Sequence, residues 1–150
     1  ERLNSLLACV GKNEIVQGLE LAKQLQKDPG NIPLRLWNAK TIASLVEFVA
    51  EHIRTEIWDG DRLSLVLILL RFLGSWLESL NLYLRQHPAA NLTKQVSGQI
   101  SRLVEAIKIV PSQMLSWKSE RTSQDVFAAS LYVLGSAFYV AEGSECAECL

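Results

Sequence analysis

The sequence contains little of what enzymes normally use for catalysis. It has only two histidines, His52 and His87, and neither stands at a spacing typical of a nucleophile and its base. It has no glycine-rich phosphate loop and no Gly-Lys-Ser/Thr signature. We therefore predict a non-catalytic protein that binds no cofactor, and we interpret both histidines as surface or boundary residues.

Cysteine is equally scarce, with only Cys9, Cys146 and Cys149. A chain of this length buries roughly 68–70% of its unfolded surface, so it needs no disulfide to fold. An odd number of cysteines then favours a reducing compartment, and we predict the cytoplasm. Cys146 and Cys149 form a C-x-x-C pair, but a zinc site needs two further ligands and a redox motif needs a following helix. We predict free thiols and no metal site.

Glycine and proline are also few, eight and four residues, and they fall mostly between segments of helical periodicity. No alternating pattern typical of a strand is present, which excludes a sheet-based fold. The net charge is −1, from 15 basic and 16 acidic residues, so the composition is not that of a strongly basic nucleic-acid-binding protein. We expect no nucleic acid partner.

What the sequence does contain is amphipathic helices. Short connections between long helices favour antiparallel neighbours, so we predict an all-α fold: a HEAT-like stack of about six antiparallel helices around a buried central helix. We expect a single interaction domain over residues 1–142 and a flexible tail over 143–150. The helices are predicted at residues 1–10, 13–27, 36–55, 62–86, 92–110 and 123–142, with Asn13 as the N-cap of the second helix.

The apolar stretch DRLSLVLILLRFLGSWLESL, residues 61–80, raises the question of a membrane span. Arg71 and Glu78 interrupt it, and a charge in the bilayer centre is costly, so we predict no membrane segment. A helix that is apolar on almost every side is a buried helix, which makes this segment the predicted central helix. A polar strip remains along it, and it is either a solvent edge or the floor of a groove for a partner: Ser64, Arg71, Ser75 and Glu78.

Tryptophan and basic residues give the candidates for a binding surface. Trp76 is expected in the core, whereas Trp37, Trp58 and Trp117 stand at loop–helix junctions, where they either cover the core or contact a partner. Basic residues near these positions form either a patch for an acidic protein surface or ordinary solubilising charge. They are Arg35, Lys40, Arg54, Arg62, Lys94, Arg102, Lys118 and Arg121.

The order of these segments resembles a known helical domain. NSLLACVGKNEIVQGLELAKQL is followed by LRLWNAKTIASLVEFVAEHIRTEI, then RLSLVLILLRFLGSWLESL, and later ISRLVEAIKIV. This pattern is similar to the C-terminal helical domain of the regulatory, WD-repeat-bearing subunit of katanin, the microtubule-severing enzyme. The likeness covers roughly residues 4–110 and is closest at LILLRFL, residues 67–73. The segment FAASLYVLGSAFYV near the C-terminus is more apolar than the family pattern.

The resemblance implies a binding role in a heterodimer. Such domains pair with the N-terminal helical domain of the katanin ATPase subunit and help target it to microtubules, centrosomes and spindle poles in the cytoskeleton. We take Arg35, Trp37, Lys40 and Arg71 as candidate partner-binding residues, with a basic face toward the acidic microtubule. Two alternatives stay open: a HEAT-like scaffold domain of a DNA-repair, meiotic or transcription assembly, and an all-helical enzyme whose only polar constellation would be the Ser64 to Glu78 strip.

Overall fold

The computed structural model describes residues 2–27, 38–55, 60–87, 94–108 and 121–144. These residues form six helices and no strand, which confirms the predicted all-α class. Their bounds are α1 Arg2–Gly11, α2 Ile15–Gln26, α3 Ala39–Thr55, α4 Gly60–Gln86, α5 Lys94–Ile107 and α7 Arg121–Ser144.

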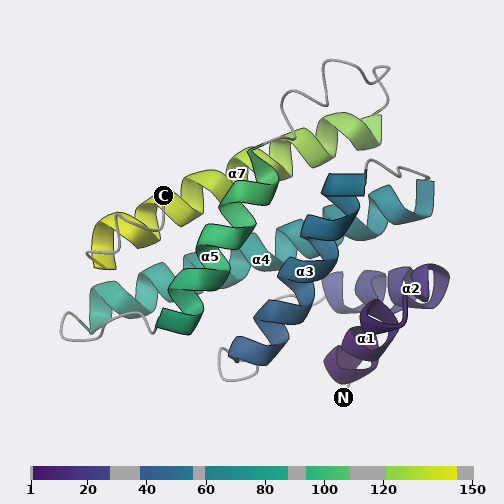
Figure 1. The fold of residues 1–150 in the computed structure, drawn as a ribbon, viewed down its shortest axis with the longest axis horizontal. Helices are drawn as coiled ribbons and strands as arrows, with labels where there is room; N and C mark the ends of the chain where they lie inside the picture. The colour runs from purple at the N-terminus through teal and green to yellow at the C-terminus, as the bar shows by residue number, and fades with distance from the viewer. Residues whose placement is uncertain (1, 28–37, 56–59, 88–93, 109–120, 145–150) are drawn as a thin grey trace.

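The described helices stack in two layers (Figure 1). One layer contains α1, α3 and α5, in which α3 packs against both neighbours. The other contains α2, α4 and α7, in which α4 packs against both neighbours, and its contact with α7 is the most extensive in the molecule. Consecutive helices reverse direction, as a stack of helical hairpins requires.

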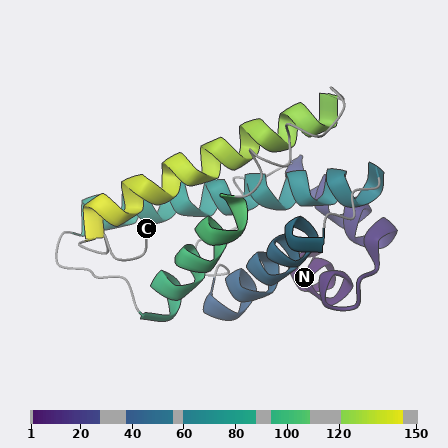
Figure 2. The ribbon, with the colours of Figure 1, turned by 45° about the horizontal axis from the view of Figure 1, so that its top comes forward.

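Within each layer, by contrast, helices run the same way. The first residues of α2, Ile15 and Val16, lie beside the first residues of α4. Tyr132 of α7 lies beside Gly74 of α4, and Ser136 shares a pocket with Asn81 farther along, so α4 and α7 are also parallel. Figure 2 shows these two helices side by side over most of their length. Antiparallel order therefore applies between the layers and parallel order within them.

Helix α4 is the centre of the core, as its all-round apolar sequence predicted. Thirteen of its residues are buried, and Leu69, Leu70 and Leu73 are completely enclosed. By length and composition α4 could also cross a membrane, but 67% of its most apolar window is buried inside the protein. Burial by neighbouring helices is therefore a sufficient reason for its apolar composition. Trp76 is buried in this core, which confirms its prediction.

Two helix boundaries depend on asparagine in different ways. Asn13 was predicted to cap the second helix, but it instead ends α1 in the left-handed conformation, with φ of 56°. The backbone N–H of Glu14 donates to Cys9 and that of Asn13 donates to Val10, which together make a Schellman motif. Asn38, in contrast, caps α3, because its Oδ1 accepts a hydrogen bond of 2.9 Å from the backbone N–H of Thr41.

The prediction for His52 as a surface or boundary residue was wrong, since only 5% of the residue is exposed. It lies on the inner side of α3, where its Nδ1 is 2.9 Å from the carbonyl oxygen of Phe48 and its ring packs on the Phe48 ring. Because one ring nitrogen has a backbone partner, burial is tolerated. His87 is exposed, as predicted, and stacks on Tyr83.

The buried position of α4 predicts how its leucines respond to truncation. We expect Leu69→Ala to lower the free energy of unfolding by about 2–5 kcal/mol, because it leaves a cavity in the centre of the core. Leu82→Ala, on the same helix but 57% exposed, should change it by less than about 0.5 kcal/mol. Urea unfolding of both variants tests this, and equal losses would contradict the placement of α4.

Candidate functional site

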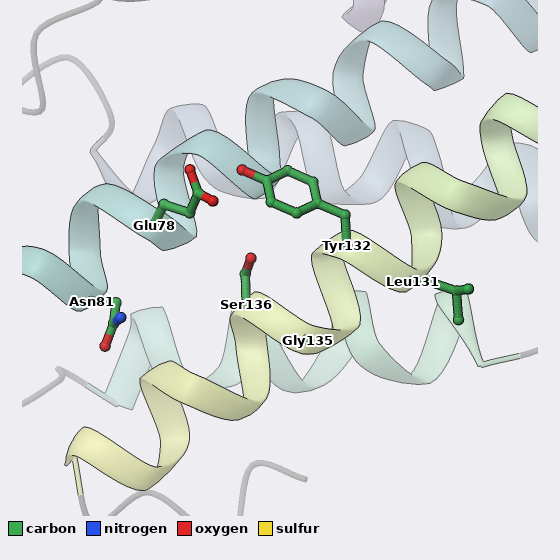
Figure 3. Close-up of a pocket in the computed structure, with 6 residues that line it drawn as sticks. All are labelled: Glu78, Asn81, Leu131, Tyr132, Gly135 and Ser136. Atoms are coloured by element: carbon green, nitrogen blue, oxygen red, sulfur yellow. The ribbon is translucent and has the colours of Figure 1, made fainter.

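A pocket of about 330 Å³ lies between α4 and α7 (Figure 3). Helix α4 contributes Glu78 and Asn81, which stand three residues apart and so share one face of the helix. Helix α7 contributes a tyrosine and a serine that stand one turn apart. The full lining is Glu78, Asn81, Leu131, Tyr132, Gly135 and Ser136.

Tyr132 connects the two helices at this pocket. Its ring extends from α7 toward α4, and its hydroxyl lies next to the carboxylate of Glu78 (Figure 3). The hydroxyl donates a hydrogen bond to Glu78 and accepts one from Ser75. Burial of the phenol raises the pKa of Tyr132 to about 12, and the hydrogen bond to Glu78 and the negative charge of Glu78 act in the same direction. The carboxylate of Glu78 is thus held in place at the edge of the pocket.

Gly74 makes this position of the tyrosine ring possible. A Cβ atom at residue 74 would overlap the ring edge of Tyr132 and lie only 2.8 Å from its Cδ2. Gly135 has the opposite surroundings, because a Cβ there would meet nothing within 4 Å. One glycine therefore permits the close contact between α4 and α7, and the other faces open space within the pocket lining.

Exposed apolar side chains lie beside the pocket. On α7, Leu131 is 49% exposed and Tyr132 is 37% exposed, and together with Ala128 and Gly135 they follow the i, i+3, i+4, i+7 spacing of one helix face. On α4, Leu82 and Tyr83 are also exposed, but they are not among the residues that line the pocket. Isolated exposed apolar residues are common, but a helical stripe beside a pocket is typical of a binding surface.

A larger hollow of about 450 Å³ lies between the end of α1 and α3, but its acidic groups are engaged. Glu47 forms a two-point ion pair with Arg102 of α5, in which Nη2 donates to Oε2 at 2.8 Å and Nε pairs with Oε1. Glu51 and His52 also make interactions. Within the described residues no group of three or more His, Cys, Asp or Glu side chains is placed to hold a metal ion. The α4/α7 pocket is therefore the strongest candidate site.

Of the four predicted partner-binding residues, only Lys40 and Arg71 lie within the described ranges. Arg35 and Trp37 lie outside the described ranges, as do Trp58, Trp117, Cys146 and Cys149. Lys40 is exposed in the first turn of α3, and Arg71 is exposed in the middle of α4. Lys40 and Arg71 therefore stand on two different helices, α3 and α4.

The predicted polar strip of α4 leads directly to the site. Arg71, Ser75 and Glu78 are exposed and Ser64 is partly exposed. The second half of the strip borders the pocket, because Ser75 and Glu78 both form hydrogen bonds with Tyr132. Sequence reasoning missed the contribution of α7: Tyr132, Gly135 and Ser136. The sequence did contain a signal for this contribution, because the segment around these residues is unusually apolar. At helical spacing it has a second apolar stripe, on the face opposite Val126 and Val133.

Comparison of the chain with protein-family models, with curated proteins and with solved structures finds no match. The likeness to the katanin regulatory subunit therefore rests on the helical pattern of the sequence.

The contact between Gly74 and Tyr132 can be tested with two alanine substitutions. We expect Gly74→Ala to destabilise the fold by about 1 kcal/mol, because overpacking costs about 1–3 kcal/mol and the gain in helix propensity returns about 1 kcal/mol. Gly98→Ala, in the middle of α5 with nothing near its Cβ, should stabilise by about 0.5–1 kcal/mol. Thermal and urea unfolding measure both, and stabilisation by Gly74→Ala would contradict the packing.

The Tyr132 hydrogen bond predicts a pH dependence. Because the pKa of Tyr132 rises from about 10 to about 12 on folding, its contribution to stability is complete below about pH 10 and is lost as the pH rises through 12. Tyrosinate absorbance should show a late ionisation that Tyr132→Phe removes and Tyr83→Phe retains. Glu78→Gln should move this ionisation to lower pH; an unchanged midpoint would exclude the Glu78 contact.

Proposed function

We propose that this protein is a non-catalytic interaction domain that binds a helical partner along the α4/α7 face. Helical stacks of this kind typically use extended faces for binding. The observation that carries the proposal is the exposed apolar stripe of α7 beside a pocket with polar side chains from both helices. An apolar helix face next to a groove is a common mode of helix recognition.

The specific partner we propose is the N-terminal helical domain of a microtubule-severing ATPase. This choice is supported by the similarity of residues 4–110 to the helical domain of the katanin regulatory subunit. Arg71 supports an electrostatic component, because it is exposed in the middle of α4 and no described residue forms an ion pair with it. A basic contact would also favour an approach to acidic microtubules. This function would place the protein at the cytoskeleton in the cytoplasm.

A second candidate is a scaffold domain of another large assembly, such as a DNA-repair, meiotic or transcription complex. The hairpin stack favours it equally, because the same architecture serves many partners. The two candidates differ in the identity of the partner, and the α4/α7 face has the same role in both.

Calorimetric titration with the N-terminal helical domain of a katanin ATPase subunit, at low and high salt, tests the proposal. We expect one-to-one binding with a dissociation constant on the order of micromolar or tighter, weaker at high salt because exposed charges are screened. Leu131→Glu should weaken binding by at least about 10-fold, because it places a charge in an apolar contact. Arg71→Glu should weaken it and reduce the salt dependence.

Two matched controls separate a binding defect from a general effect of charge. Val16→Glu makes the same kind of change as Leu131→Glu at an exposed apolar residue of α2, and Lys94→Glu reverses an exposed charge at the start of α5, where an acidic residue is favourable. Both should bind like the unchanged protein. Absence of binding by the folded domain would exclude the severing ATPase and leave the scaffold candidate.

A further inference from the structure

We infer that the α4/α7 pocket receives a lysine or arginine side chain from the partner helix, an assignment that rests on the proposed function and gives the chemistry of its central contact. The pocket volume of about 330 Å³ is at the lower end of the range for small ligands, so it can hold one long side chain. The polar groups that line the pocket determine which kind of side chain it can hold.

The polar groups of the pocket favour a hydrogen-bond donor with a positive charge. The Glu78 carboxylate has two oxygens, and the Tyr132 hydroxyl occupies only part of their accepting capacity. Asn81 of α4 and Ser136 of α7 also line the pocket, and each side chain contains an oxygen that can accept a hydrogen bond. No described residue forms a hydrogen bond with the side chain of Asn81 or Ser136. An ammonium or guanidinium group offers several donors to such a set.

The charges around the pocket also favour a positively charged ligand. Glu78 is the only charged residue in the described lining. The basic residues of α4 that flank it, Arg71 and Arg85, are each seven residues away, which is about 10 Å along the helix axis. At that distance exposed charges are substantially screened, so the negative charge of Glu78 remains available to a ligand.

The rim indicates that the cation comes from a protein helix. Leu131 lines the pocket and is 49% exposed, and a Cβ atom at Gly135 would meet nothing within 4 Å. An aliphatic stem would contact the apolar rim while its charged end reaches Glu78, which is how lysine and arginine bury their side chains. The helix that presents this side chain would lie along the exposed stripe of α7.

The test uses n-butylammonium chloride as a minimal probe, with amide NMR of the folded domain as the readout. We expect saturating shifts at Gly135, Ser136 and the Asn81 side chain, with a dissociation constant on the order of millimolar for so small a ligand. Neutral 1-butanol should bind at least about 10-fold more weakly, because it lacks the charge-assisted hydrogen bonds.

Two variants at the pocket and one control make the test specific. Glu78→Gln should weaken butylammonium binding by at least about 10-fold, and Gly135→Leu should abolish it by filling the open space. Glu105→Gln, an exposed acidic residue of α5 outside the pocket, should have no effect. Equal binding of 1-butanol, or full binding by Glu78→Gln, would overturn the inference. A butylammonium dissociation constant below about 10 µM would also overturn it, because the site would then bind free amines without a helix.

The outcome is separable from that of the partner titration. Partner binding that is unaffected by Glu78→Lys and Gly135→Leu would leave the proposed function intact and overturn the pocket assignment. Butylammonium binding without partner binding would retain the cation chemistry of the pocket and reject the severing ATPase as its source.

Discussion

Burial of α4 on nearly every side is the constraint from which the rest of the architecture follows. A helix with leucine, isoleucine, phenylalanine and tryptophan around most of its circumference cannot lie at the surface of a protein in water. Each fully buried side chain of this size stabilises the fold by about 1.5–3 kcal/mol. The chain therefore has to bring helices against α4 from several directions, and α2, α3 and α7 do so. The two layers of described helices meet this requirement.

The same constraint explains why α7 has two apolar faces. Its inner face, with Val126, Val133 and Ala137, completes the core and covers the part of α4 that α2 and α3 leave open. The outer face of α7 does not contribute to the core, yet the apolar residues Ala128 and Leu131 are exposed there. Polar residues would serve a free surface better. The proposed partner helix would cover these two exposed residues.

The sequence predicted the features that depend on local periodicity and missed those that depend on register between distant helices. The class, the six helices and the central position of α4 follow from apolar spacing, and Trp76 in the core follows with them. Asn13 was misassigned because asparagine both caps helices and tolerates a positive φ, and only the backbone distinguishes these uses. His52 was misplaced because a backbone acceptor on its own helix makes burial possible. The pocket was missed because Glu78 and Tyr132 meet only when α4 and α7 are aligned.

Gly74 of α4 and Gly135 of α7 lie where these two helices pack together, and their surroundings differ. Gly74 is required by packing, because the Tyr132 ring occupies the space where its side chain would lie. Gly135 has no such neighbour, and a glycine inside a helix costs about 1 kcal/mol relative to alanine. Folding alone would therefore favour a larger residue at 135. Glycine at 135 leaves open space in the lining that it shares with Glu78, Asn81 and Ser136, and the proposed cationic side chain would occupy this space.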